Sequence, residues 1–196
     1  MAFTTIDDPS AYFKVQLYTG DGSTQAITFD DTDTDMQPDL VWLKDRATSE
    51  ASHKLYDSVR GTTKYLALNN NGAEGTESGV TAFGSDGFTL GSAAGTNANT
   101  VAFASWCWKE SATSGFDIVA YTGNGSARTI SHSLSAIPHL ICVKNLDTTD
   151  SWQVYHGANT AAPETDYLSL DVVTVTTDNS DRWNDTAPTS SVFSLE

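Results

Sequence analysis

Two nearly identical segments, YTGDG at 18–22 and YTGNG at 121–125, occur in the two halves of a chain of 196 residues. Further blocks repeat in the same order in both halves. They are YFKVQLYTGDG (12–22) with FDIVAYTGNG (116–125), QAITFD (25–30) with RTISHSL (128–134), PDLVWLK (38–44) with PHLICVK (138–144), HKLYDSVRG (53–61) with WQVYHGAN (152–159), YLAL (65–68) with YLSL (167–170), and GFTLG (87–91) with VFSLE (192–196). Because six matching blocks in one order are hard to obtain by chance, the sequence predicts a tandem duplication. The predicted modules are 1–110 and 116–196, with 111–115 as a linker.

The repeated blocks have the composition of strands. Each alternates apolar and polar residues over four to eight positions and is rich in Val, Ile, Thr, Tyr, Phe and Trp. The spacers contain Gly, Asn, Asp, Ser and Thr, which are typical of turns. No amphipathic helix of about ten or more residues is predicted, and 51–61 is the nearest candidate. The chain is therefore expected to be all-β, with two tandem antiparallel β-sandwich (jelly-roll-like) modules.

The repeated segments themselves predict tight turns. Asp21 and Asn124 each precede a glycine, which matches the central pair of a type I′ hairpin turn. A hairpin joining the first two strands of each module is expected. Positive φ is sterically cheap at its glycines, which are Gly20, Gly22, Gly123 and Gly125.

The two halves differ at their ends. The first continues after GFTLG with SAAGTNANTVAFASWCWK (92–109), a further strand, whereas the second stops at SVFSLE. The second module is therefore predicted to lack its last strand, which exposes an apolar groove and leaves an unpaired edge. Three remedies are open: segment 1–11 fills the gap, a neighbouring subunit donates a strand, or the polypeptide continues beyond Glu196. Pairing with another chain or with further polypeptide is favoured over a self-sufficient monomer.

Composition narrows the function classes. With 25 acidic and 10 basic residues the net charge is −15, which disfavours binding to nucleic acid. No apolar stretch approaches the length of a membrane span, and the first residues lack a signal-peptide pattern. Cys107 and Cys142 lie in apolar runs and are predicted to be core thiols in a reducing compartment, not a disulfide.

One acidic segment is a candidate for a cation. Asp31, Asp33 and Asp35 alternate beside Asp30, and carboxylates so spaced in a loop can converge on calcium. The segment lacks the glycine and glutamate of an EF-hand loop. A solvated acidic hairpin tip is the favoured interpretation and calcium binding is the alternative.

No motif indicates catalysis. The four histidines, His53, His132, His139 and His156, are scattered and are expected at surfaces or strand ends, although His132 and His139 flank one turn. No serine lies in a nucleophile elbow, and no cysteine has a base near it in sequence. The protein is expected not to be an enzyme, and no catalytic, cofactor or metal residue is assigned.

The tryptophans have two interpretations, as core residues or as platforms for sugar rings. Trp42 and Trp106 are predicted to lie in the core, and Trp106 and Trp108 to share one face of a strand. Trp183, in the polar segment SDRWNDTAP, is a candidate for glycan binding as well as for burial.

Four segments, YTGNG, PDLVWLK, WNDTAPTSSVFS and FGSDGFTLG…TNANTVAFASWCWK, resemble a repeated module of structural and tail-fibre-like proteins of marine bacteriophages, notably those of cyanobacteria. The resemblance covers residues 12–193. In those proteins the module occurs in tandem, often beside concanavalin-like lectin domains, and usually runs on from SVFSL through a glycine into its last strand. The resemblance carries over no catalytic residues.

The resemblance implies a non-enzymatic virion structural protein. The expected role is an external appendage or tail-fibre component that is made in the host cytoplasm and assembles through β-edge contacts. Its expected partners are other virion proteins and copies of itself, without nucleic acid or membrane insertion. Two alternatives remain open: a capsid decoration protein on the head lattice, and a carbohydrate-binding module that recognises host-surface glycan.

Overall fold

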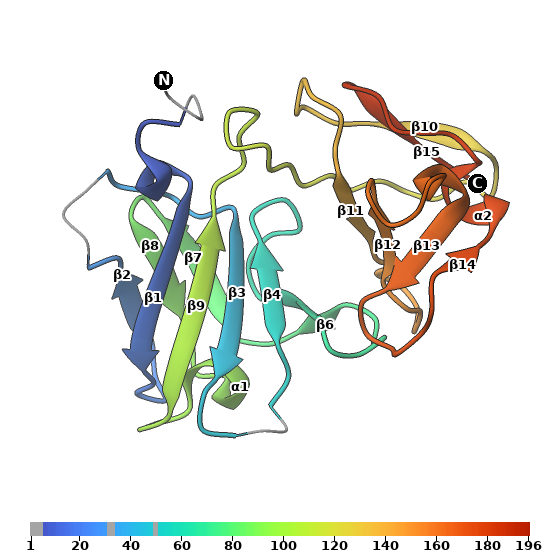
Figure 1. The fold of residues 1–196 in the computed structure, drawn as a ribbon. Helices are drawn as coiled ribbons and strands as arrows, with labels where there is room; N and C mark the ends of the chain where they lie inside the picture. Colours follow the sequence, from blue (N-terminus) through green and yellow to red (C-terminus); the bar gives the residue numbers. More distant parts are fainter. Residues whose placement is uncertain (1–5, 31–33, 49–50) are drawn as a thin grey trace. The chain divides into compact units, whose positions relative to one another are not determined.

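The computed structural model describes residues 6–30, 34–48 and 51–196, which form two compact units (Figure 1). The first unit holds the described residues up to Leu68 together with Glu74–Glu110, and the second holds Asn69–Ala73 and Ser111–Glu196. Antiparallel strands dominate both units and the helices are single turns, so the predicted all-β class is confirmed. Within the described part of the chain, no helix has the length and hydropathy of a membrane span.

The first unit is a sandwich of two sheets. Figure 1 shows the smaller, three-stranded sheet behind the larger, six-stranded one. In spatial order the larger sheet contains β1 (Phe13–Thr19), β9 (Ala102–Trp108), β3 (Leu40–Asp45), β4 (Lys54–Asp57), β5 (Lys64–Ala67) and β6 (Gly75–Thr76). The smaller contains β2 (Gln25–Thr28), β8 (Gly87–Leu90) and β7 (Val80–Gly84), and the helical turns are η1 (Pro9–Ala11) and α1 (Ala94–Asn97).

The core of the first unit lies between these sheets. Val41 and Leu43 of β3 point inward at alternate positions, as the period of a strand requires, and Leu90 of β8 meets them from the other sheet. All three side chains are almost completely buried, and each such burial contributes about 1.5–3 kcal/mol. The same cluster includes Ile27, Phe29, Met36, Tyr56, Val80, Phe88 and Cys107.

The second unit is smaller. Its four-stranded sheet contains β11 (Leu140–Val143), β12 (Gln153–His156), β13 (Asp166–Ser169) and β14 (Thr177–Asp178), in that order. A two-stranded sheet pairs β10 (Arg128–Ser131) with β15 (Val192–Leu195), and the helical turns are η2 (Pro163–Thr165) and α2 (Ser180–Trp183). Its buried apolar side chains are Ile130, Trp152, Val154, Tyr155, Trp183 and Phe193.

The strand registers of the second unit repeat those of the first. Under the block alignment, β11 to β14 take the places of β3 to β6, and β10 and β15 those of β2 and β8. Leu140 pairs with His156 as Leu40 pairs with Asp57. Arg128 pairs with Leu195 as Gln25 pairs with Leu90. Among the described residues nothing takes the place of β9, and residues 117–122, which align with β1, form no strand.

The predicted hairpin between the first two strands is wrong. β1 pairs with β9 and β2 pairs with β8, so the 18–22 segment joins two different sheets. Of the glycines expected to need positive φ, only Gly22 (+74°) and Gly125 (+67°) adopt it. The Asp-Gly pair serves an Asx turn instead, because Asp21 Oδ1 accepts a hydrogen bond from Ser23 N at 2.7 Å.

Two predictions about core residues need correction. Both cysteines are free, and burial raises the pKa of the Cys107 thiol to about 12, but Cys142 is exposed. Cys142 aligns with Trp42, whose side chain points away from the core on the outer face of β3. Trp42 and Trp106 are only half-buried on that outer face, so their predicted place in the core is also wrong. Trp106 and Trp108 do share one face of β9.

Candidate functional site

In the first unit, the segment that follows β8 closes over the 18–22 turn. Tyr18 Oη donates a hydrogen bond to Thr96 O at 2.6 Å, and burial raises the pKa of this phenol well above its usual value. The turn's backbone amides are satisfied by the same segment, because Gly20 N donates to Val101 O at 2.8 Å and Gly22 N to Asn97 O at 2.9 Å. Segment 92–101 is thus an integral part of the first unit.

Asn97 is the centre of this closure. Its side chain is fully buried, and its Oδ1 accepts from Asp21 N at 2.9 Å. Its Nδ2 donates to Ser23 O at 2.6 Å and to Gly91 O at 2.9 Å. A buried amide that uses both its donor and its acceptor in this way fixes the segment in one position.

β9 then continues from this closure into the middle of the large sheet. It pairs with β1 from Phe13↔Trp108 to Thr19↔Ala102, and with β3 from Leu40↔Trp108 to Asp45↔Phe103. β1 is therefore attached to the sheet only through β9. Without β9 the edge of β3 would be open.

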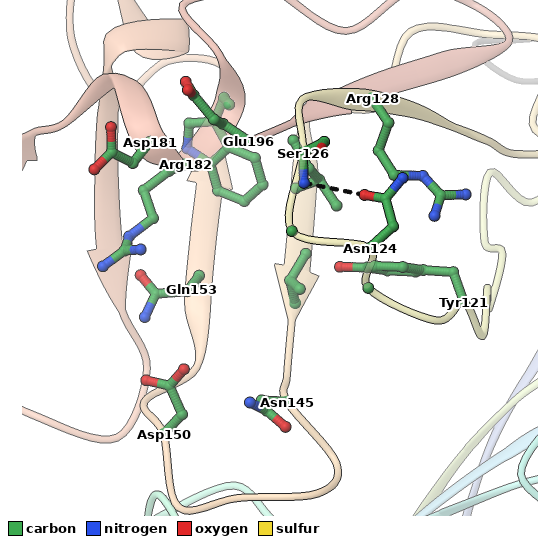
Figure 2. A pocket seen from close by; sticks show the side chains of 15 residues that line it. Tyr121, Asn124, Ser126, Arg128, Asn145, Asp150, Gln153, Asp181, Arg182 and Glu196 are labelled. Carbon is green, nitrogen blue, oxygen red and sulfur yellow. Dashed lines mark hydrogen bonds between the residues drawn. The ribbon is translucent and has the colours of Figure 1, made fainter.

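In the second unit, the counterparts of residues that segment 92–101 contacts line a cavity of about 300 Å³ (Figure 2). They come from the 121–128 segment, the end of β11, the start of β12, α2 and the last two residues of the chain. Charges of both signs are present, from Arg128 and Arg182 and from Asp150, Asp181 and Glu196. A cavity of this volume is at the lower end of the range for small ligands.

The turn that lines this cavity has the same local geometry as its counterpart. Ser126 N donates to Asn124 Oδ1 at 3.2 Å, the bond that Figure 2 marks, as Ser23 N donates to Asp21 Oδ1. Arg128 Nη1 donates to Thr122 O at 2.9 Å, as Gln25 Nε2 donates to Thr19 O at 3.0 Å. The 121–128 turn is therefore shaped like the 18–25 turn but has no segment closed over it.

A pair of glycines shows the difference directly. A Cβ at Gly20 would lie 2.3 Å from Ala98 O, so the approach of segment 92–101 requires a glycine there. A Cβ at the aligned Gly123 would meet nothing within 4 Å, and Gly123 does not have positive φ. Nothing in the described residues explains why position 123 is a glycine.

Two polar atoms at this cavity also lack partners. Gln153 Oε1 and Arg182 Nε are buried without a hydrogen bond, although the Arg182 guanidinium lies 5.0 Å from the centre of the Tyr167 ring. Buried polar atoms are satisfied in most native structures, and leaving one unsatisfied costs about 1–3 kcal/mol. Both residues line the cavity, but these two atoms are themselves buried.

The cavity adjoins an open sheet edge. β11 is the first strand of its sheet, and among the described residues no strand pairs with its outer edge. Leu140 on β11 is 59% exposed, whereas Leu40, its counterpart beside β9, is half-buried. We call the cavity together with the outer edge of β11 the open groove.

A second exposed feature is an aromatic face on the first unit. Trp42, Trp106 and Trp108 form a cluster on the outer side of the six-stranded sheet, with ring centres 5.2 Å apart for Trp42–Trp106 and 6.3 Å for Trp42–Trp108. Phe13 packs on Trp108 at 4.9 Å. The neighbouring side chains Val15 and Leu17 are exposed, so this face is apolar over three strands, β1, β9 and β3.

His53 borders the aromatic face. Its Nδ1 accepts a hydrogen bond from Trp42 Nε1 at 3.0 Å. Burial, and then the positive charge of Lys44, lower the pKa of His53 below 6.5. The neutral imidazole therefore holds Trp42 in position.

The candidate cation site is not formed within the described residues. Asp31 and Asp33 lie outside the described residues, and Asp35 is exposed. In the part of the chain that the structure describes, no three His, Cys, Asp or Glu side chains are grouped to hold a metal ion. Of the two histidines that flank one turn, His132 places its Nε2 3.2 Å from Thr189 O.

Two groups of charged side chains in the first unit are structural pairs. Asp57 accepts from Arg60, whose Nη1 also contacts Glu74 at 3.2 Å. Glu77 accepts from Tyr56 Oη and is paired with Lys54. Each carboxylate has a cation beside it, as a satisfied buried ion pair requires.

Trp183 is not an exposed ring. Only 2% of its surface is exposed, its Nε1 donates to Asp166 O at 2.9 Å, and it packs edge-on against Tyr155. Stacking of a sugar on Trp183 is therefore excluded in this structure.

Sequence reasoning predicted the open edge and the shared face of Trp106 and Trp108, but not the polar cavity or the extent of the aromatic face. The aromatic face follows from the alternation of Phe13, Val15 and Leu17 in one strand and of Trp106 and Trp108 in another. The cavity follows from YTGNG, a turn repeated without the segment 92–101 that closes its counterpart.

Comparisons with known proteins give a family and no activity. A family model described as a domain of unknown function (DUF7483) matches residues 8–196. No curated protein and no solved structure matches the chain.

Proposed function

Because the chain belongs to the family described as a domain of unknown function (DUF7483), its role has to be inferred from its own residues, and we propose a non-enzymatic structural protein of a bacteriophage virion. In this role the protein is part of an external appendage or tail fibre and joins its neighbours through strand-edge contacts. The virion itself is proposed from the resemblance of the repeated segments. The mode of assembly is proposed from the structure.

The observation that carries the proposed assembly is the open edge of β11. Monomeric proteins protect strand edges with charge, proline, bulges or covering segments, because an unpaired edge pairs with other chains. β11 has the sequence Leu-Ile-Cys-Val, without charge or proline, and among the described residues no strand takes the place that β9 has beside β3. Strand addition at such an edge is a common way to join protein subunits.

Other exposed apolar side chains support an assembly role. Val173 and Val175, in the loop between β13 and β14, are almost fully exposed, and Leu170 and Val172 in the same loop are half exposed. Contiguous apolar patches of this kind mark interaction surfaces in otherwise polar proteins.

The proposal is tested on virus particles. Antibodies against the purified chain are applied to particles of the phage that encodes it and located by immuno-electron microscopy. Labelling of a tail fibre or another external appendage is the expected result. Labelling confined to the head lattice would replace this role by that of a capsid decoration protein. Intact particles without label, and without the protein in their mass spectra, would contradict a virion role.

A carbohydrate-binding module is the second candidate, and the aromatic face favours it. Trp42, Trp106 and Trp108 present a partly exposed, nearly continuous ring surface, which is the chemistry that stacks on sugar rings. Binding of host-surface polysaccharide, measured by glycan array and calorimetry, should then fall strongly in Trp108→Ala and little in Leu17→Ala on the same face. Absence of binding to any host glycan would exclude this candidate.

A further inference from the structure

We propose that the open groove binds a segment of a partner protein chain that has the chemistry of residues 92–109. Such a segment is a helical turn of small residues that carries an asparagine, followed by a strand whose alternate residues are apolar. The inference rests on the proposed function and adds to it the chemistry of the segment that the partner contributes. It does not depend on where in the particle the protein lies.

The hydrogen-bonding groups of the groove match those used in the first unit. Asn97 there bonds to Asp21 N and Ser23 O, which align with Asn124 N and Ser126 O at the cavity. The 121–125 turn already has the required shape, because it forms the same Asx turn as its counterpart. An asparagine side chain of the partner therefore finds a preformed donor and acceptor.

Gly123 supplies the second argument. At the aligned Gly20 the carbonyl of Ala98 approaches so closely that a Cβ is excluded, whereas the space above Gly123 is empty. A glycine without steric need in the free chain is explained if a backbone passes over it in the complex. Two polar side chains, Gln153 and Arg182, line the same cavity.

The strand part of the segment follows from β11. Its core-facing residues, Ile141 and Val143, are only half-buried, and they align with Val41 and Leu43, which β9 helps to bury completely. A partner strand beside β11 would therefore place apolar residues over Ile141 and Val143. It would also offer residues 117–122 the strand partner that β1 has in β9.

A second copy of this chain does not fit as the donor. In each copy, residues 92–109 contain Asn97, which is fully buried and hydrogen-bonded, and β9, which is paired on both sides. Release of this segment would expose the core of the first unit and detach β1. Residues 92–109 of a second copy are therefore not available to fill the open groove.

The first test uses a synthetic peptide of residues 92–109 carrying Cys107→Ser, titrated into the full chain and followed by amide NMR. We expect saturable shifts at Gly123, Gly125 and residues 140–143. The same peptide with Asn97→Ala should bind about tenfold or more weakly, because it loses several hydrogen bonds to the turn. Shifts confined to β1 and β3, or equal affinity of the two peptides, would overturn the inference.

The matched protein variants are Gly123→Ala and Ala161→Ser. Each adds one heavy atom to an exposed residue, but Ala161 does not line the cavity. Gly123→Ala should fold normally and bind the peptide about tenfold or more weakly, since its methyl group takes the place of the passing backbone. Ala161→Ser should bind as the unaltered chain does. Unchanged binding by Gly123→Ala would contradict the proposed path of the segment.

A graft tests the groove without dependence on peptide solubility. Glu196→Gly followed by residues 92–109 places the segment where the alignment expects it, and the control graft carries Asn97→Ala within the added segment. The first graft should protect the amides of residues 140–143 from hydrogen exchange and raise the unfolding temperature of the second unit. The control should do so less. A graft that leaves residues 140–143 unprotected overturns the inference, while the labelling of virus particles would still decide the proposed function.

Discussion

Trp183 anchors the core of the second unit through two kinds of contact. Its indole is buried against Tyr155, and its Nε1 satisfies the carbonyl of Asp166. It is the last residue of α2, and Asn179 caps the start of that helical turn by accepting a hydrogen bond from Asp181 N. A polar sequence context can therefore surround a core residue when one short helical turn directs the side chain inward.

Replacing this tryptophan should destabilise the second unit. Trp183→Ala removes a large buried ring and leaves Asp166 O without a partner, so we expect a loss of about 3–5 kcal/mol in the free energy of unfolding. Urea unfolding measures it, with Val173→Ala as the exposed control expected to change stability by less than about 0.5 kcal/mol. Unchanged stability of Trp183→Ala would contradict its place in the core.

His53 should make the stability of the aromatic face depend on pH. Its pKa in the folded chain is lowered below 6.5, chiefly by burial, so the unfolded chain binds the proton more readily. This contribution to stability is complete above pH 6.5 and is lost as the pH falls from 6.5 toward the pKa of the folded state. His53→Gln keeps an acceptor for Trp42 Nε1 and removes the titration. Urea unfolding is measured at pH 7.5 and 5.5, about one unit either side of the usual histidine pKa. The difference in unfolding free energy between the two pH values should be smaller in this variant than in the unaltered chain. An equal difference would contradict the assignment.

Among the elements, the aligned turns at 18–22 and 121–125 should differ in how much stability they lose when glycine is replaced by alanine. Gly20→Ala forces a methyl group against the carbonyl of Ala98 and should cost about 1–3 kcal/mol of stability. Gly123→Ala meets open space and should change stability by less than about 0.5 kcal/mol. Thermal unfolding of the two variants compares them, and equal losses would mean that the second turn is also covered.

The strands of this fold were predictable because their pattern is local. Alternation in PDLVWLK and PHLICVK identified β3 and β11, and the repeated blocks align at the registers that the sheets adopt. The mistaken hairpin shows the limit of such reasoning. An Asp-Gly pair serves a turn between sheets as well as a turn within one, and only the partner of β1, far away in β9, decides between them.

The site was less predictable because it depends on which face of a strand packs against the core, and on a turn that no described segment covers. Which side of β3 carries Trp42 follows from the sheet that packs against the other side, so propensity could not distinguish core from outer face. The open groove exists because nothing covers the 121–125 turn. Its signal in the sequence was the missing counterpart of 92–109, which predicted an apolar groove and an open edge but not a cavity lined by charged residues.

For the whole molecule, the net charge of −15 opposes self-association through an open apolar edge. Like charges repel at low ionic strength and are screened when salt is raised. Raising the ionic strength from about 0.01 M to about 1 M shortens the screening length from about 30 Å to about 3 Å and should increase self-association, measured by light scattering. Leu140→Lys places a charge beside the edge and should reduce that increase. Salt-independent monomers of the unaltered chain would contradict this role for the edge.

Among the described strands, β11 is the open edge of its sheet, whereas its counterpart β3 lies inside one. Amide hydrogen exchange of the full chain compares the two strands directly, residue by residue, at 40–43 and 140–143. We expect slow exchange throughout β3, and fast exchange for those amides of β11 that point away from β12. Equal, slow exchange in both strands would show that the edge is already covered and would contradict the open groove.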